Sequence, residues 1–210
     1  MIQPTRMRIF PCALLLSAAF ASAAAPYSSV DVTLKKEVGP LVVAKSDRVS
    51  PTLGAARPTV RSGVAYVGAS HGVGAWNVGL SPRLPLGLSV TQETGSTVLN
   101  LEGLPLTRLN VTTGAGPVAL RLPSRTLNAN VAQETGSLEI FLPRDTGLRL
   151  IIKTFGTGSL MVEGTGVASG TDLSGTFETA NFGSARYKVT LNLTHGAGPV
   201  VVYAPGEKGS

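Results

Sequence analysis

Among the polar residues of this chain, two glutamates at glycine turns have the spacing closest to that of a catalytic acid–base pair. Glu93 and Glu134 share the context Gln-Glu-Thr-Gly-Ser, and each lies two residues before a turn glycine. If these segments stack as strands about 4.8 Å apart, a spacing of two strands separates the carboxylates by roughly 9–10 Å. That distance is near the upper limit for an inverting glycosidase. Solvated turns explain the same pattern without catalysis, and we favour that interpretation.

The same turn position alternates between glutamate and glycine along much of the chain. The residues in order are Glu37, Gly72, Glu93, Gly114, Glu134 and Gly156, and the last turn has Gly196. Alternation would keep carboxylates from meeting on neighbouring strands. A weak cation site would need more oxygen ligands than this position supplies.

The remaining polar candidates do not form a recognisable active site. His71 and His195 each lie three residues before a turn glycine, near opposite ends of the chain, so they cannot share a metal ion. We expect both at exposed turn positions. Ser96 and Ser137 lie on turns, but nothing in the sequence places a histidine beside them. Trp76 occupies an inward-facing position, where a core role is favoured over a sugar platform. We therefore predict no catalytic, cofactor-binding or metal-binding residues and no enzyme activity.

A repeated module must position these residues. Its clearest copy, Leu106 to Pro123, alternates apolar and polar residues on both sides of a Gly-Ala-Gly turn, which is typical of half-buried strands. The second turn glycine recurs at Gly39, Gly74, Gly95, Gly116, Gly136, Gly158 and Gly198. From Gly74 to Gly158 the steps are 20 to 22 residues, and the 40-residue step to Gly198 leaves room for a degenerate module near Gly175.

Apolar residues keep fixed positions within the modules. Four residues after the seven anchor glycines stand Val43, Val78, Leu99, Leu120, Ile140, Val162 and Val202. A module of about 20 residues cannot bury such a face alone, whereas stacked modules can. We therefore predict an all-β fold, a single-stranded β-helix (β-solenoid) with rungs of about 20 residues, with a β-sandwich as the alternative. Lys153 breaks the pattern, which indicates a bulge that turns Leu150 and Ile152 inward.

The ends of the chain differ from the repeat. We divide the chain into a signal peptide (1–25), an N-terminal strand with a cap or loop segment (26–63), a repeat domain (64–204) and a flexible tail (205–210). The irregular segments Ala44–Ser62 and Ser169–Arg186 are candidate caps, because the ends of a stack expose unpaired strand edges.

Composition and the N-terminus indicate a secreted protein. Arg6 and Arg8 precede a short apolar stretch and small residues at 21–25, as in a secretory signal peptide. The only cysteine, Cys12, lies inside this segment. The net charge of +6 falls to about +4 without Arg6 and Arg8, and no Lys/Arg run exceeds two residues, so a nucleic-acid surface is excluded. We expect a location in the periplasm or at the cell surface, with no transmembrane segment after cleavage.

The pattern L-x-V-x-x-G-x-G-x-V-x-L-x-L and its closing copy, Leu191 to Val202, resemble a known group of domains. These are the secreted β-strand-repeat proteins called adhesin-like or toast-rack domains, which are related to the LiaF family of envelope-stress regulators. The resemblance covers about Val64 to Tyr203 and implies a right-handed or similar single-stranded β-helix in the cell envelope. It carries over no functional residue. The signal peptide and the lack of membrane spans argue against a direct signalling role.

These observations favour a non-enzymatic envelope protein that presents a rigid surface in a structural or adhesin-like role. One alternative is a periplasmic partner of an envelope-stress complex, and a less favoured one is a β-helix enzyme acting on polysaccharide. The expected partner is an envelope polysaccharide or an envelope protein, and no cofactor is expected. Asn110-Val111-Thr112 and Asn192-Leu193-Thr194 match the glycosylation pattern, which is common by chance.

Overall fold

The computed structural model describes residues 27–46 and 58–206, and within these ranges the regular elements are strands. The predicted signal peptide, most of the loop after the first module and the last four residues lie outside the described residues. The strands are β1 (Ser29–Val38), β2 (Leu41–Lys45), β3 (Thr59–Arg61), β4 (Val64–Val73), β5 (Trp76–Leu80), β6 (Leu86–Thr94), β7 (Thr97–Asn100), β8 (Leu106–Ala115), β9 (Val118–Arg121), β10 (Leu127–Thr135), β11 (Leu138–Phe141), β12 (Thr146–Val162), β13 (Thr165–Glu178), β14 (Tyr187–Ala197) and β15 (Val200–Val202). The all-β prediction is confirmed.

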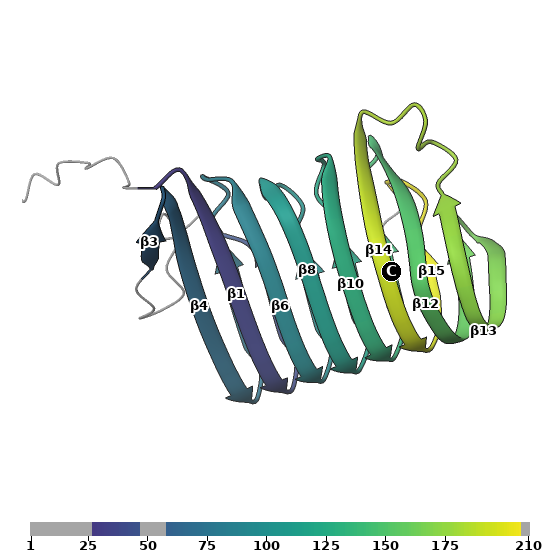
Figure 1. Ribbon diagram of the computed structural model, residues 1–210, viewed down its shortest axis with the longest axis horizontal. Coiled ribbons are helices and arrows are strands. Elements are labelled where there is room, and N and C mark those ends of the chain that lie inside the picture. The colour runs from purple at the N-terminus through teal and green to yellow at the C-terminus, as the bar shows by residue number, and fades with distance from the viewer. Residues whose placement is uncertain (1–26, 47–57, 207–210) are drawn as a thin grey trace, which may run out of the picture.

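A long strand, a glycine turn and a short strand form one unit, which we call a rung. The long strands pair in the order β4, β1, β6, β8, β10, β14 and β12, and the short strands pair in the order β5, β2, β7, β9, β11 and β15. Strand β12 runs through its own turn without interruption, so its two ends pair with β14 and β15. Figure 1 shows the long strands side by side along the whole molecule.

Almost all pairings are parallel, and only β3–β4 and β12–β13 are antiparallel. All fifteen strands belong to one large sheet. Equivalent positions of successive rungs therefore lie next to one another in columns. The columns seen in the sequence are the same columns that the strand register builds, for example Val32 between Val67 and Leu88.

The rungs do not stack in the order of the sequence. Strand β1, first in the chain, lies between β4 and β6, and β14, in the last rung, lies between β10 and β12. The first and the last rung of the sequence therefore each have a hydrogen-bonded neighbour on both edges. The inward columns repeat almost unchanged from rung to rung, so an apolar pattern cannot distinguish this order from a sequential one.

The core fills the space between the long and the short strands. All seven residues of the predicted apolar column are buried, and six of them are at most 5% exposed. Each fully buried Val or Leu contributes about 1.5–3 kcal/mol relative to an exposed one. The predicted bulge is confirmed: Leu150 and Ile152 are buried, Lys153 is exposed, and the β12–β14 register shifts after Ile152.

The prediction of a degenerate module near Gly175 was wrong. After Val162 the chain turns back, and β13 pairs antiparallel with β12 from Arg149 to Val162. This hairpin covers the β12 edge that a parallel rung would otherwise have occupied, so the candidate cap at Ser169–Arg186 includes much of the edge-covering strand. At the opposite end, β3 covers only the start of β4, at Val64 to Tyr66.

Glycine is required at the turns for two reasons. Gly116 has a φ of 136°, where side chains are rarely found, and a Cβ there would lie 2.2 Å from the carbonyl oxygen of Gly95 on the next rung. Gly74, on the first rung of the stack, has a φ of 105°, but its nearest neighbour would be a His71 carbon at 3.9 Å. The rungs can therefore approach closely only because the turns lack side chains.

Candidate functional site

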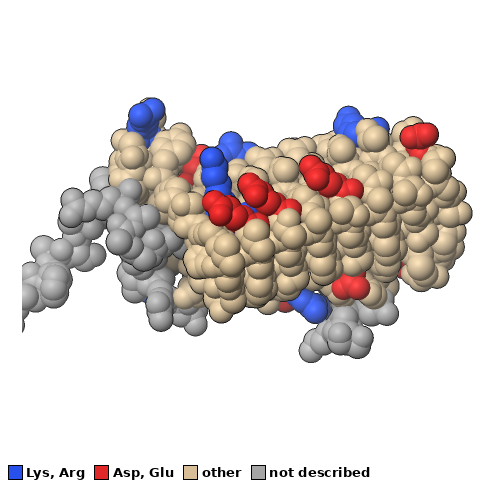
Figure 2. All heavy atoms as spheres, turned by 90° about the horizontal axis from the view of Figure 1, so that it is seen from below, with Lys and Arg blue, Asp and Glu red and all other residues tan. Residues whose placement is uncertain are grey.

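Exposed carboxylates mark the edge of the molecule formed by the glycine turns. Glu93 and Glu134 belong to β6 and β10, which are separated by β8, so they are two rungs apart as predicted. Glu37 is different. Because β1 pairs with β6, it lies opposite Glu93, and the predicted separation of all turn carboxylates by an intervening glycine was wrong. Figure 2, which views this edge, shows acidic groups in a row along it.

This edge does not assemble an acid–base pair around a substrate groove. A depression of about 390 Å³ borders Glu134, but Glu93 does not line it. Glu93 and Glu134 are exposed, and Gly114 stands between them in the stack. The geometry is that of solvated turns, and among the described residues the two carboxylates do not line one shared depression.

The two histidines are not at exposed turn positions, and that expectation was wrong. His195 is 0% exposed and His71 is half-buried. They belong to an inward-facing polar column next to the turns, three residues before each turn glycine. In spatial order the column contains His71, Lys36, Gln92, Thr113, Gln133 and His195, followed by Phe155. His71 and His195 are five rungs apart in the stack, which agrees with the expectation that they do not share a metal ion.

The buried column hydrogen-bonds to the carbonyl groups of the turns. Gln92 Nε2 donates to the Gly39 carbonyl at 2.8 Å, and Gln133 Nε2 donates to the Gly116 carbonyl at 2.7 Å. Lys36 Nζ donates to the carbonyls of Val38 and Gly72. Buried carbonyls without partners would be unfavourable by about 1–3 kcal/mol each. Lys36, Gln92 and Gln133 therefore stabilise the turns, and these three polar residues have a structural role.

His195 performs the same task as a neutral ring. Its Nε2 lies 3.1 Å from the Gly198 carbonyl, so Nε2 carries the proton and donates it. Burial lowers the pKa of His195 below its usual value of 6.5, while the bond to Gly198 acts in the opposite direction. The Phe155 ring packs beside it, with the ring centroids 5.0 Å apart.

Trp76 and the turn serines make packing and main-chain contacts. Trp76 is half-buried, packs against the core and stacks on His71 with ring centroids 5.5 Å apart. Ser96 and Ser137 accept main-chain hydrogen bonds from Leu41 and Val118 through their carbonyls. Within the described ranges, neither serine side chain hydrogen-bonds to a histidine, and no group of three metal-ligating side chains is found.

The middle of the outward face of the long strands is largely neutral and polar, and charged residues such as Asp31, Lys35 and Arg108 lie on the same face. Two neighbouring columns run along it: Thr33, Ser89, Asn110, Asn130 and Asn192, and beside them Lys35, Thr91, Thr112, Ala132 and Thr194. Asn130 Nδ2 donates to Asn110 Oδ1 at 2.8 Å, and Asn192 Nδ2 donates to Asn130 Oδ1 at 3.1 Å. We call these three residues the asparagine ladder. The face is turned toward the viewer in Figure 1.

The outward face of the short strands is more apolar. Val98 and Met161 are 36% and 38% exposed, Val42 and Val201 are half-buried in the same column, and Glu139 interrupts it between Ala119 and Val201. The column beside it contains a stack of three side chains. The Arg121 guanidinium lies 4.3 Å from the centre of the Phe141 ring, which stacks on Tyr203 with centroids 4.4 Å apart.

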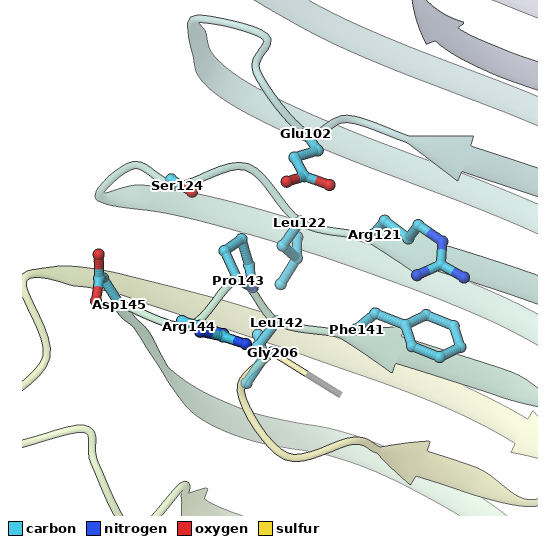
Figure 3. A pocket seen from close by; sticks show the side chains of 10 residues that line it. All are labelled: Glu102, Arg121, Leu122, Ser124, Phe141, Leu142, Pro143, Arg144, Asp145 and Gly206. Carbon is cyan, nitrogen blue, oxygen red and sulfur yellow. The ribbon is translucent and has the colours of Figure 1, made fainter. Parts of the chain in front are cut away.

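A cavity of about 360 Å³ lies next to this stack, where short strands lead into the corner loops. Figure 3 shows Arg121 and Phe141 on one side of it and Arg144 on the other. Glu102 and Asp145 also line it, so the cavity presents two charges of each sign over Leu122 and Leu142. This balance does not select a ligand of one charge.

Sequence reasoning missed the buried column and the asparagine ladder. The signal for the column was present as Lys, Gln and Thr at the same position as the histidines, but a position next to a turn appeared exposed. The signal for the ladder was the repeated Asn-x-Thr, which was interpreted only as a chance glycosylation pattern.

Among the described residues, no helix is long and apolar enough to cross a membrane.

Comparisons with known proteins agree with the resemblance seen in the sequence. A family model described as the N-terminal domain of toast_rack, DUF2154, matches residues 27–141. A crystal structure from Clostridium sporogenes ATCC 15579, described as a "putative cell adhesion protein", has a TM-score of 0.70. It is 17% identical and covers 85% of this chain and 94% of its own, so the likeness concerns the fold. No curated protein matches this chain.

Proposed function

This chain belongs to the family of the toast_rack N-terminal domain, and we propose that it is a non-enzymatic cell-envelope protein that presents a rigid surface in a structural or adhesin-like role. The observation that carries the proposal is the stack of parallel rungs in register. The first and the last rung of the sequence lie inside this stack and not at its ends. Such a body holds its outward columns at a fixed spacing of about 4.8 Å. It can bind a long partner without first ordering loops.

We propose that the stack is a β-solenoid, a single-stranded β-helix whose rungs are closed by the glycine turns and the corner loops. The parallel register of both sets of strands supports this description. The proposed location, the periplasm or the cell surface, rests on the signal peptide predicted at residues 1–25. The cell-adhesion description of the structural neighbour is consistent with this location.

A retention experiment tests this function. Mature protein beginning at Ala24 or Pro26 is immobilised and exposed to the envelope fraction of its own source, and the bound material is identified. Retention of a polysaccharide or peptidoglycan fraction supports the structural or adhesin-like role. If the retained polymer is shortened, the hydrolase alternative returns, and Glu93→Gln should then abolish the shortening without changing the melting temperature. No retention of any envelope component contradicts the proposal.

A second candidate function is that of a periplasmic partner of an envelope-stress complex. The outward column of the short strands supports it, because Val42, Val98 and Ala119 stand side by side on three successive rungs and present an apolar strip that suits a protein partner. Crosslinking in cells should then recover one defined envelope protein, and Val98→Lys should abolish that crosslink. Recovery of many unrelated proteins with unchanged yield in the variant would contradict this candidate.

A further inference from the structure

We propose that the outward face of the long strands carries a binding site for an uncharged glycan, centred on Ala132. The inference rests on the proposed function, since it assigns the ligand class and the position on the rigid surface. It concerns two adjoining depressions on the rungs of β8, β10, β14 and β12, with volumes of about 550 and 390 Å³. We call them together the Ala132 trough.

Ala132 forms the floor of the trough because its side chain ends at Cβ. Both depressions include Thr112, Ala132 and Thr194, which are partners in the strand register on three successive rungs. Asn130 and Glu134 flank Ala132 along its own strand. Four rungs at about 4.8 Å give the trough a length of roughly 14 Å, which suits a short stretch of a sugar chain.

The asparagine ladder forms one side of the trough and is held in place before any ligand binds. Its hydrogen bonds of 2.8 and 3.1 Å fix the amide planes of Asn110, Asn130 and Asn192. An amide has two N–H donors and an oxygen with two lone pairs, so each Asn retains hydrogen-bonding capacity toward the solvent side. Binding to such fixed groups loses little side-chain entropy.

The chemistry of the lining selects uncharged hydroxyl-rich ligands. Apart from Lys153 and Glu134, the side chains that line the trough are neutral. The Asn and Thr groups can both donate and accept hydrogen bonds, as sugar hydroxyls do. A polyanion would need clustered cations, and the basic residues that line the trough are Lys153 and the buried, neutral His195. The lining contains no Trp, Tyr or Phe, so we expect weak binding per site that becomes useful on a long polymer.

Affinity gel electrophoresis of the full mature chain tests the site, with dextran, hydroxyethyl cellulose or glycol chitin in the gel and alginate as the anionic comparison. Ala132→Tyr fills the floor of the trough. Thr91→Tyr is the matched control, because Thr91 lies in the same outward column two rungs away and does not line the trough. Thr194→Tyr is a second trough variant, and melting temperatures identify any variant that fails to fold.

We expect retardation of the wild-type protein by at least one neutral polymer, with affinity reduced about tenfold or more by Ala132→Tyr and changed less than about twofold by Thr91→Tyr. Retardation by alginate alone, equal effects of both tyrosines, or no retardation in any neutral gel would overturn the site. If no neutral polymer retards the wild-type protein but the envelope fraction still retains it, the site is wrong and the proposed function stands.

Discussion

Replacing a glycine in the middle of the stack should be much more damaging than replacing one at its end. Gly116 and Gly74 both have a positive φ, of 136° and 105°, so alanine meets backbone strain of about 1–3 kcal/mol at either position. Only at Gly116 would the new Cβ also meet a carbonyl oxygen, that of Gly95 at 2.2 Å. Separating two packed rungs to relieve this contact adds about 1–3 kcal/mol.

Three variants separate the two effects. Gly68→Ala is the neutral control, because Gly68 has no positive φ and no heavy atom within 4 Å of the added Cβ. Gly74→Ala reports backbone strain alone, and Gly116→Ala reports strain together with the collision. We expect free energies of unfolding reduced by about 0, 1–3 and 2–6 kcal/mol, respectively.

Urea denaturation and thermal melting of the purified mature protein measure these differences. A gap of about 2 kcal/mol between the two turn variants corresponds to about 4–8 °C in melting temperature for a domain of this size. Equal losses at Gly74 and Gly116 would refute the reasoning, because the close approach of neighbouring turns would then contribute nothing.

Three further predictions concern the buried column and the cap. The folded pKa of His195 is below 6.5, so the unfolded chain binds the proton first. The contribution of His195 to stability is therefore complete above about pH 7.5 and falls as the pH drops through 6.5, and His195→Gln should flatten that decline in denaturation curves at several pH values. Gln133→Leu leaves the inward Gly116 carbonyl without its side-chain donor and should destabilise the fold by about 1–3 kcal/mol, whereas the exposed Asn128→Leu should change the urea midpoint little. Deleting Thr165–Glu178 exposes the β12 edge and should produce oligomers in light scattering, and a clean monomer would contradict the role of β13 as a cap.

The repeat, the turns and the core could be predicted because each is written in local spacing. Period-two alternation around a glycine identifies two strands and a turn, and the apolar column identifies the buried side. The bulge at Lys153 could also be predicted. The repeat places this lysine at an inward position, and an extra residue in the strand is needed to turn its charge outward. These signals involve neighbours within one rung.

The order of the rungs and the polar column could not be predicted in the same way. Strand β1 satisfies the same inward columns at the end of the stack or between β4 and β6, so the long-range choice leaves no trace in its alternation. The placement of Glu37 opposite Glu93 depends on that choice. His195 was missed for another reason: a polar residue beside a turn is normally solvated, but here the turn directs carbonyls inward and requires buried donors.

The order in which the rungs stack underlies both the proposed surface and the site on it, and disulfide formation tests it directly. Lys35 is the register partner of Thr91 on β6 and of Ser70 on β4, so it separates the other two. Neighbouring strands about 4.8 Å apart can be bridged, whereas a separation of two strands exceeds the 7 Å limit between Cα atoms. The only natural cysteine is Cys12, which a mature chain beginning at Ala24 lacks. We predict that the double variant Lys35→Cys with Thr91→Cys forms a disulfide on mild oxidation, and that Ser70→Cys with Thr91→Cys does not. A disulfide in the second pair and none in the first would show that the rungs follow the sequence, and would contradict the stack described here.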